Sequence, residues 1–235
     1  MASSSLRIGV IGVGFGTAVQ IPGFQSEGVE VTSVCARRRE RAQEAADRFG
    51  IPGVYDDYHN MLRDAPIDAV SIVSPIPLHH PMTMAALDAG KHVLCEKPFA
   101  LDQTQAREMW RKAESTGLTN MIGHEFRFAS ARMRVKELIE EGYVGPLHLV
   151  LMRLVNGPRR GFQPRPLTDR DDAAQGGGFL WGLGSHYIDC LRHWFGEVTS
   201  VSGHVATRLG ERTLPDSDAI VQATADDSFN FTLGF

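Results

Sequence analysis

The sequence predicts an α/β protein whose N-terminal half is a doubly wound parallel sheet. Between residues 6 and 123, short apolar or β-branched runs alternate with longer amphipathic segments, a rhythm typical of repeated βαβ units. A glycine-rich turn separates the first run from the first amphipathic segment. With 235 residues and 43% apolar content, the chain is long enough to bury a core of this kind.

Five strands and four helices account for this half. We expect the strands at 6–13, 29–36, 69–73, 92–95 and 119–123, and the helices at 18–25, 38–49, 81–89 and 102–115. Asp102 suits an N-cap and Pro81 a first helical turn. Glycines 50, 90 and 117 stand where a left-handed residue ends a helix.

The rhythm changes near residue 124, so we expect one domain over 1–123 and a second over 124–235. The second contains a helix at 132–141 and a strand-like run at 147–155. A long loop follows at 156–178, because that stretch is rich in Gly, Pro, Arg and Asp and has no period. We then expect a helix at 185–195 and two strands, 198–209 and 219–234, joined by a turn around Pro215.

Composition narrows the class of partner. The formal net charge is -4, which favours neither nucleic acid nor an anionic membrane, and no apolar stretch approaches the length of a membrane span. Cys35, Cys95 and Cys190 are far apart and lack metal-ligand spacing, so neither a disulfide framework nor a metal site is expected. The N-terminus is short and polar rather than a signal peptide. We expect a cytoplasmic protein that acts on a small molecule.

The glycine turn reads GVGFGT over residues 12–17. Glycines let a backbone bend sharply and approach a pyrophosphate, whose charge is met by N–H groups at a helix N-terminus. Thr17 occupies the third glycine position of the usual G-x-G-x-x-G pattern, and Gly16 stands one residue early. An ordinary strand-to-helix turn is the alternative. The candidate cofactor-binding residues here are Gly12, Gly14, Phe15, Gly16 and Thr17.

The end of the second run indicates which dinucleotide would bind. NAD-binding chains commonly place an acid there to hydrogen-bond the ribose 2′-hydroxyl. This chain has Ala36, Arg37 and Arg38 instead, which favours the 2′-phosphate of NADP over NAD. The alternative is that these arginines are a solvated helix start.

The fourth run ends in Glu96, Lys97 and Pro98. Ligands of open parallel sheets lie beyond the carboxyl ends of the strands, so this polar pair faces the ligand side. Pro98 has a fixed φ and no N–H, which ends the strand and stiffens the turn. Lys97 is therefore the first candidate for chemistry, and a salt bridge between Glu96 and Lys97 is the alternative.

With the glycine turn, the segment AGKHVLCEKP at 89–98 and the segment GGGFLWGLGSHYID at 176–189, the chain resembles the Gfo/Idh/MocA oxidoreductase family. The resemblance implies an N-terminal Rossmann domain followed by a C-terminal α/β domain built on an open, mostly antiparallel sheet. In the family that sheet usually covers the nicotinamide and carries the oligomer contact, which implies a homo-oligomer. Family chains usually continue well past this point, so the resemblance also implies truncation within the second domain.

The resemblance implies a catalytic set of Lys97, His186 and Asp189. The family's first aspartate falls on Gly182, so that group is absent. The segment PIPLH at 75–79 keeps the family's proline and histidine but has Ile76 in place of asparagine. Further cofactor contacts are implied for Ser74, Pro75, His79, Glu96 and Lys97.

Hydride transfer to or from an alcohol carbon requires a group that moves the hydroxyl proton. For Lys97 to do so, its pKa must fall from about 10.4 by roughly 2 to 3 units. His186 would donate a hydrogen bond to the substrate oxygen or relay the proton. Asp189 lies one turn later and would orient His186 or partly replace the missing acid; a structural hydrogen bond is the alternative.

We therefore expect an NADP(H)-preferring oxidoreductase, with NAD as the other candidate, acting on a sugar-like or cyclic hydroxyl or carbonyl compound. Two other functions remain open. One is a non-catalytic dinucleotide-binding regulatory protein of the same fold, and the other is a redox-assisted glycoside hydrolase or lyase.

Overall fold

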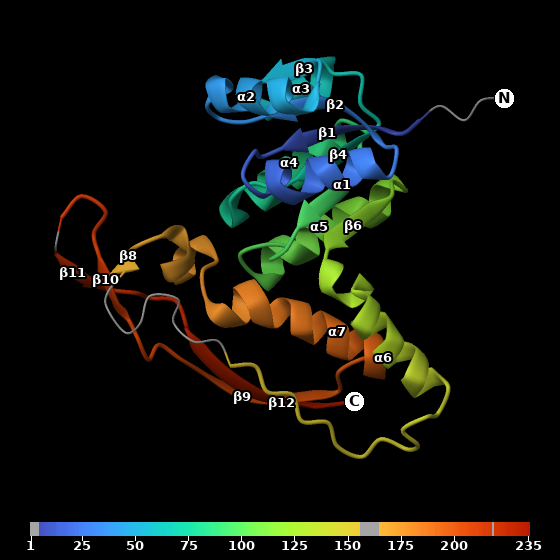
Figure 1. Cartoon of the computed structure of the whole chain (residues 1–235), viewed down its shortest axis with the longest axis vertical. Coiled ribbons are helices and arrows are strands. Elements are labelled where there is room, and N and C mark those ends of the chain that lie inside the picture. The colour runs from blue at the N-terminus through green and yellow to red at the C-terminus, as the bar shows by residue number, and fades with distance from the viewer. Residues whose placement is uncertain (1–4, 156–164, 218) are drawn as a thin grey trace. The chain divides into compact units, whose positions relative to one another are not determined.

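The computed structural model describes residues 5–155, 165–217 and 219–235. Contacts divide the chain into two compact units, Met1–Gly123 and His124–Phe235. Figure 1 shows the first unit in blue to green and the second in yellow-green to red.

The first unit is built on a six-stranded parallel sheet, which confirms the predicted fold class. The strands lie in the order β3-β2-β1-β4-β5-β6. Their bounds are β1 Arg7–Ile11, β2 Glu30–Cys35, β3 Gly53–Tyr55, β4 Ala69–Ile72, β5 His92–Glu96 and β6 Asn120–Gly123. The chain runs outward from β1 to β3, then returns to β4 on the other side of β1.

Helices pack against both faces of this sheet and form two hydrophobic clusters (Figure 1). On one face, Ile21 and Ala42 pack with Val10. On the other face, Met61 and Met109 pack with the strand side chains. Helices α1 (Ile21–Ser26) and α2 (Arg39–Phe49) therefore cover the first face, and α3 (Tyr58–Asp64), α4 (His79–Asp88) and α5 (Gln103–Thr116) cover the second.

Local sequence explains where these helices begin and end. The Asp102 carboxylate accepts a hydrogen bond from Gln105 N at 2.9 Å, as an N-cap should. Gly50 and Gly117 end α2 and α5 with φ of 68° and 65°, a conformation that glycine adopts without steric cost. The helix after the glycine turn is less regular than expected, because Gly16–Gln20 winds with π-helical hydrogen bonds before α1 begins.

In the second unit, helices α6 (Ser130–Glu140) and α7 (Ser185–Phe195) accompany two small sheets. Strands β9 (Ser200–Ala206) and β12 (Ser228–Gly234) pair antiparallel, as Figure 1 shows. Strand β10 (Glu211–Thr213) pairs with β11 (Ile220–Gln222) and with β8 (Arg165–Pro166). The single strand expected at 219–234 is thus two strands in different sheets.

Two further expectations need correction. Residues 147–155 form no strand, and Leu149 and Leu151 are 76% and 87% exposed. Alternating hydrophobicity makes a strand only where a partner supplies the ladder hydrogen bonds, and no described strand pairs with this segment. Within the loop expected at 156–178, residues 156–164 lie outside the described residues. The remainder holds β8 and the short helices Asp169–Asp171 and Ala173–Gln175.

Candidate functional site

Four loops of the first unit carry the predicted cofactor-binding residues, and all four follow neighbouring strands. Residues 36–38 follow β2, residues 12–17 follow β1, residues 74–79 follow β4, and Lys97 follows β5. Because the strands are parallel, their carboxyl ends share one edge of the sheet. The chain also changes direction between β1 and β4, which is where open α/β sheets bind ligands. The structure therefore brings these residues to a single edge.

The glycine turn approaches the end of β4 closely. Gly12 has a φ of 115°, and a methyl group there would lie 2.4 Å from the Val73 carbonyl oxygen. Gly12 N donates to Cys35 O at 2.9 Å, so the turn is tied to β2 as well. Gly14 differs, because a methyl group at that position would meet no atom within 4 Å. One glycine is thus required by the fold, and the next leaves open space beside the backbone.

Thr17, which stands at the third glycine position, makes hydrogen bonds of its own to the turn. Its hydroxyl donates to Val13 O at 2.8 Å and approaches Gly14 O at 3.1 Å, so it bonds back onto the turn. Gly16 packs against Val10, where a methyl group would lie 3.2 Å from the valine side chain. Close packing of helix on strand therefore falls to Gly16, one residue earlier than in the usual pattern.

Glu96 links the β5 turn to the helix that follows the glycine turn. Its carboxylate is buried, with the residue 7% exposed, and it accepts a hydrogen bond from Gln20 Nε2 at 2.5 Å. The side-chain amide oxygen of Gln20, Oε1, in turn accepts from Ser71 Oγ at 3.0 Å. The second Glu96 oxygen accepts from Lys97 N at 3.2 Å. These contacts fix the backbone from which the Lys97 side chain extends.

The His79 ring holds two loops of this edge together. It is 1% exposed, and its nitrogens lie 2.9 Å from the carbonyl oxygens of Pro98 and Ser74. Burial lowers the pKa of His79, and its contacts to backbone carbonyls partly offset that effect. Both ring nitrogens of His79 therefore contact backbone carbonyls, and the predicted cofactor contact of this residue stays a prediction. The adjoining Lys97–Pro98 peptide bond is cis.

In the second unit, His186 stands in the first turn of α7 and is 2% exposed. Its ring stacks on Phe126 with centroids 3.9 Å apart, and the His124 ring meets it edge-on at 5.7 Å. The Glu125 carboxylate lies 3.7 Å from His186 Nε2. The short helix Glu125–Phe128 therefore supplies an acid and an aromatic face to the predicted histidine.

Asp189 lies on the same helix and engages Arg127 through both carboxylate oxygens. The Nε to Oδ2 distance is 2.8 Å, and the pair raises the pKa of Arg127. A bidentate pair of this kind favours the structural alternative for Asp189, and its catalytic role stays a prediction. Asp189 therefore joins α7 to the short helix that carries Glu125.

Asp226 stands at the start of the helical segment that leads to His186. Its carboxylate accepts hydrogen bonds from Phe179 N at 3.1 Å and Leu180 N at 2.9 Å. Gly178 has a φ of 121°, and a methyl group there would lie 2.3 Å from Asp226 Oδ1. The sequence pattern did not indicate this cap, because its two sides are 46 and 47 residues apart.

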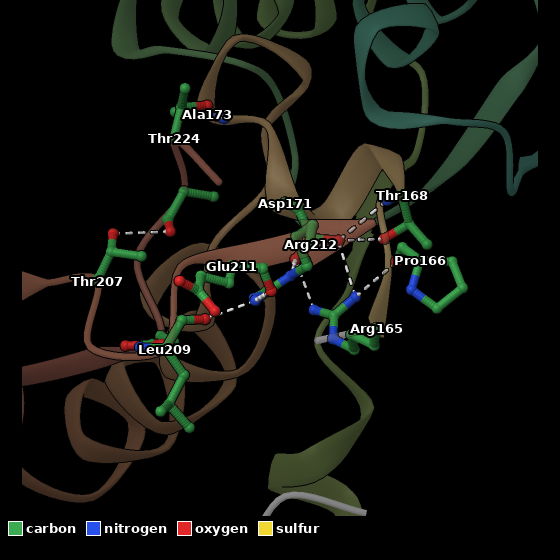
Figure 2. A network of polar contacts seen from close by, with 12 residues as sticks. Arg165, Pro166, Thr168, Asp171, Ala173, Thr207, Leu209, Glu211, Arg212 and Thr224 are labelled. Atoms are coloured by element: carbon green, nitrogen blue, oxygen red, sulfur yellow. Dashed lines mark hydrogen bonds and ion pairs between the residues drawn. The ribbon is translucent and has the colours of Figure 1, made fainter. Parts of the chain in front are cut away.

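A buried ion cluster anchors the chain just before this segment (Figure 2). The Asp171 carboxylate accepts from Arg165 at 2.5 and 2.8 Å and from Arg212 Nε at 2.8 Å. Thr168 donates to the same carboxylate through its backbone N–H and its hydroxyl. Asp171 thereby joins the short helix Asp169–Asp171 to β8 and β10.

Within residues 5–155, 165–217 and 219–235, no helix is long and apolar enough to cross a membrane. Among the same residues, no group of three or more His, Cys, Asp or Glu side chains is arranged to hold a metal ion.

The strand order and the glycine turn define a Rossmann-type α/β protein with a second, mixed α/β unit. The sequence matches the description "Oxidoreductase family, NAD-binding Rossmann fold" over residues 6–124 and "GFO/IDH/MocA C-terminal domain" over residues 133–235. The chain belongs to the Gfo/Idh/MocA family.

Named relatives share this family. The chain is 33% identical to D-glucoside 3-dehydrogenase of Escherichia coli over 214 residues, covering 89% of this chain and 60% of that protein. It is 31% identical to levoglucosan dehydrogenase of Pseudarthrobacter phenanthrenivorans over 226 residues, covering 92% and 57%. A solved levoglucosan dehydrogenase in complex with NADH and levoglucosan has a TM-score of 0.80 and 27% identity, covering 99% and 64%. The chain thus spans about three fifths of these relatives.

Proposed function

We propose that this protein is a nicotinamide-dependent oxidoreductase that transfers hydride between the cofactor and a sugar-like or cyclic hydroxyl or carbonyl compound. The observation that carries the proposal is the shared edge in the first unit. There the glycine turn after β1 and the Glu96–Lys97 turn after β5 flank the loop after β4. A glycine turn and a lysine that both follow the carboxyl ends of strands in one parallel sheet support this proposal.

The residues of this edge fit a dinucleotide. The open space beside Gly14 lets a pyrophosphate approach the backbone, and the helix N-terminus that follows offers N–H groups to its charge. Phe15, Ser74, Pro75 and the Glu96–Lys97 backbone complete the proposed cofactor contacts. We assign His79 a positioning role, because its ring holds the Ser74 and Pro98 carbonyls.

We further propose a preference for NADP over NAD. Ala36 is small and uncharged, and Arg37 and Arg38 are exposed directly after β2, where they can meet a 2′-phosphate. The levoglucosan dehydrogenase structure contains NADH, so the two cofactors need direct comparison. Titration calorimetry should show tighter binding of NADP, with a loss of about tenfold or more on Arg38→Ala and no change on Arg41→Ala. Equal affinities for NAD and NADP would contradict the preference.

In the proposed reaction, the bound nicotinamide supplies the redox step. Lys97 takes the hydroxyl proton during alcohol oxidation and returns it during carbonyl reduction. His186 assists through the substrate oxygen. Lys97 and His186 belong to different units, and they are assigned to one reaction because both match the family's sequence motifs. Asp189 supports the fold around His186 through Arg127 rather than reacting.

The proposed substrate class is supported by the names of two relatives, a D-glucoside 3-dehydrogenase and a levoglucosan dehydrogenase. The test is nicotinamide reduction with a panel of glucosides, anhydrosugars and cyclic polyols. Turnover should fall by about 10²-fold or more in Lys97→Ala, while cofactor affinity persists. Lys112→Ala, which removes a lysine from a surface ion pair on α5, is the matched control. Cofactor binding without turnover on any substrate would favour a regulatory protein, and product without net cofactor reduction would favour a hydrolase or lyase.

A cytoplasmic location and a homo-oligomer are also part of this proposal. Cys35, Cys95 and Cys190 are buried free thiols, as suits a reducing compartment. Val201 and Val205 on β9 are 71% and 51% exposed, which supports further contacts of this sheet.

A further inference from the structure

Some neighbours of His186 favour its neutral imidazole, and others favour the charged imidazolium. The residue is 2% exposed, and burial disfavours an imidazolium. The Arg132 guanidinium carbon lies 4.5 Å from the centre of the Phe126 ring on which His186 stacks. Arg127 is the neighbour of Phe126 in the short helix Glu125–Phe128. These cations also favour the neutral ring. Asp189 is bound to Arg127, so the two charges of that pair largely cancel at a distance.

Two groups favour the charged ring. The Phe126 face lies 3.9 Å from the His186 ring centre and presents the negative side of its quadrupole to a cation. The Glu125 carboxylate lies 3.7 Å from Nε2, so its negative charge favours the imidazolium. His124, which meets His186 edge-on at 5.7 Å, is the other titratable neighbour.

We propose that Glu125 is a positioning residue that favours the protonated form of His186, which donates a hydrogen bond to the substrate oxygen. The step moves no electrons: Glu125 stays ionised, and His186 keeps a proton that solvent supplied. The role in catalysis rests on the proposed function, whereas the electrostatic pairing can be measured without turnover. The side chain of Glu125 is 50% exposed, so it reaches this buried ring from the solvent side.

The local sequence offers one further observation. Gly182, one turn before His186, carries no side chain, and a methyl group there would meet no atom within 4 Å. Glu125 is an acid at an ion-pair distance, 3.7 Å, from His186 Nε2. Its chain position, 61 residues before the histidine, hides this relationship from motif searches.

The test is an NMR titration of the nine histidines in ¹⁵N-labelled protein, with His186 assigned by its loss in His186→Asn. Glu125→Gln should lower the His186 midpoint by at least about 0.5 pH unit, because unit charges about 4 Å apart interact by about 1 kcal/mol even in water. Glu125→Asp should restore part of the shift. Glu137→Gln, which removes an acid from α6, should leave the midpoint unchanged. An unchanged midpoint in folded Glu125→Gln would overturn the proposal.

A second readout separates this inference from the proposed function. On a substrate that turns over, Glu125→Gln should lower kcat more than it raises KM and should shift the pH profile in the same direction as the NMR midpoint. A shifted midpoint with no nicotinamide turnover in any variant would support the pairing and refute the oxidoreductase. Turnover with an unaltered pH profile would refute the catalytic role of the pairing.

Discussion

Gln20 donates a 2.5 Å hydrogen bond to the buried Glu96 carboxylate, and the two residues are 76 positions apart in the chain. Gln20 ends the helical segment that follows the glycine turn, and Glu96 ends β5, directly before Lys97. The relationship makes Glu96 a structural bridge in addition to a proposed cofactor contact. It also explains why an acid can be buried here, because each of its oxygens accepts a hydrogen bond.

Removing the Gln20 amide should destabilise the fold, because the buried Glu96 carboxylate loses a hydrogen-bond donor. We expect Gln20→Ala to lower the free energy of unfolding by about 2 kcal/mol, since hydrogen bonds to buried charged groups are worth more than neutral ones. Urea denaturation measures the effect. Gln25→Ala is the control, because Gln25 makes an exposed hydrogen bond to Phe49 O. Equal losses in the two variants would contradict the bridging role.

The glycine turn offers a matched pair. Gly12→Ala should lower the free energy of unfolding by at least about 2 kcal/mol, because the new methyl group meets Val73 O and the φ of 115° is strained for alanine. Gly14→Ala should leave stability nearly unchanged and weaken dinucleotide binding by about tenfold or more. Urea unfolding and titration calorimetry measure the two effects. Unaltered dinucleotide affinity in Gly14→Ala would argue against a pyrophosphate beside this residue.

A second glycine pair tests the Asp226 cap. Gly178 and Gly196 both have positive φ, of 121° and 96°, but only a methyl group on Gly178 would collide with Asp226. We expect Gly178→Ala to cost more stability than Gly196→Ala by about 1 kcal/mol, the usual value of a helix cap. Thermal melts followed by circular dichroism compare the variants. Similar melting temperatures would show that the Asp226 cap is dispensable.

The Asp171 cluster predicts an acid-sensitive term in stability. Burial raises the pKa of Asp171, but hydrogen bonds from Arg165, Arg212 and Thr168 outweigh it and bring the pKa to about 2. Because the folded pKa lies below the ordinary 3.8, the cluster stabilises the fold at pH values above about 4. That contribution, about 2 kcal/mol, is lost as the pH falls towards 2.

Asp171→Asn should therefore lower stability at neutral pH by about 3 kcal/mol, since it leaves buried guanidinium charge without its partner. It should also flatten the dependence of unfolding free energy on pH between about 4 and 2. Asp169→Asn, on the exposed side of the same turn, is the control. Parallel pH profiles for the wild type and Asp171→Asn would contradict the assignment.

The sequence predicted the parallel sheet because each major strand is a continuous apolar run and most helices end at a glycine or begin at a cap. It missed β3 and α3, because three strand residues at 53–55 are too few to show a period and the helix at 58–64 is only two turns long. It predicted a strand at 147–155 from alternation alone, which contains no information about a partner.

The site shows the same division. Motif spacing identified Lys97 and His186, because their neighbours in sequence carry the pattern. Gln20, Glu125 and Asp226 could not be found in this way, because each acts on a residue 46 or more positions away. Such contacts become visible only once the fold fixes which loops are neighbours.

The residues at the amino ends of the parallel strands differ in role from those at the carboxyl ends. At the amino ends of β1 and β4, Arg7 clasps Asp68 with hydrogen bonds from its backbone and its guanidinium. At the carboxyl ends stand the loops that we assign to the cofactor. If that proposal is correct, substitutions at 36–38 or 74–75 should change the choice of cofactor and leave the Arg7–Asp68 contact at the opposite ends of the strands intact. The loops after the strands could therefore be redesigned separately from the parallel sheet that carries them.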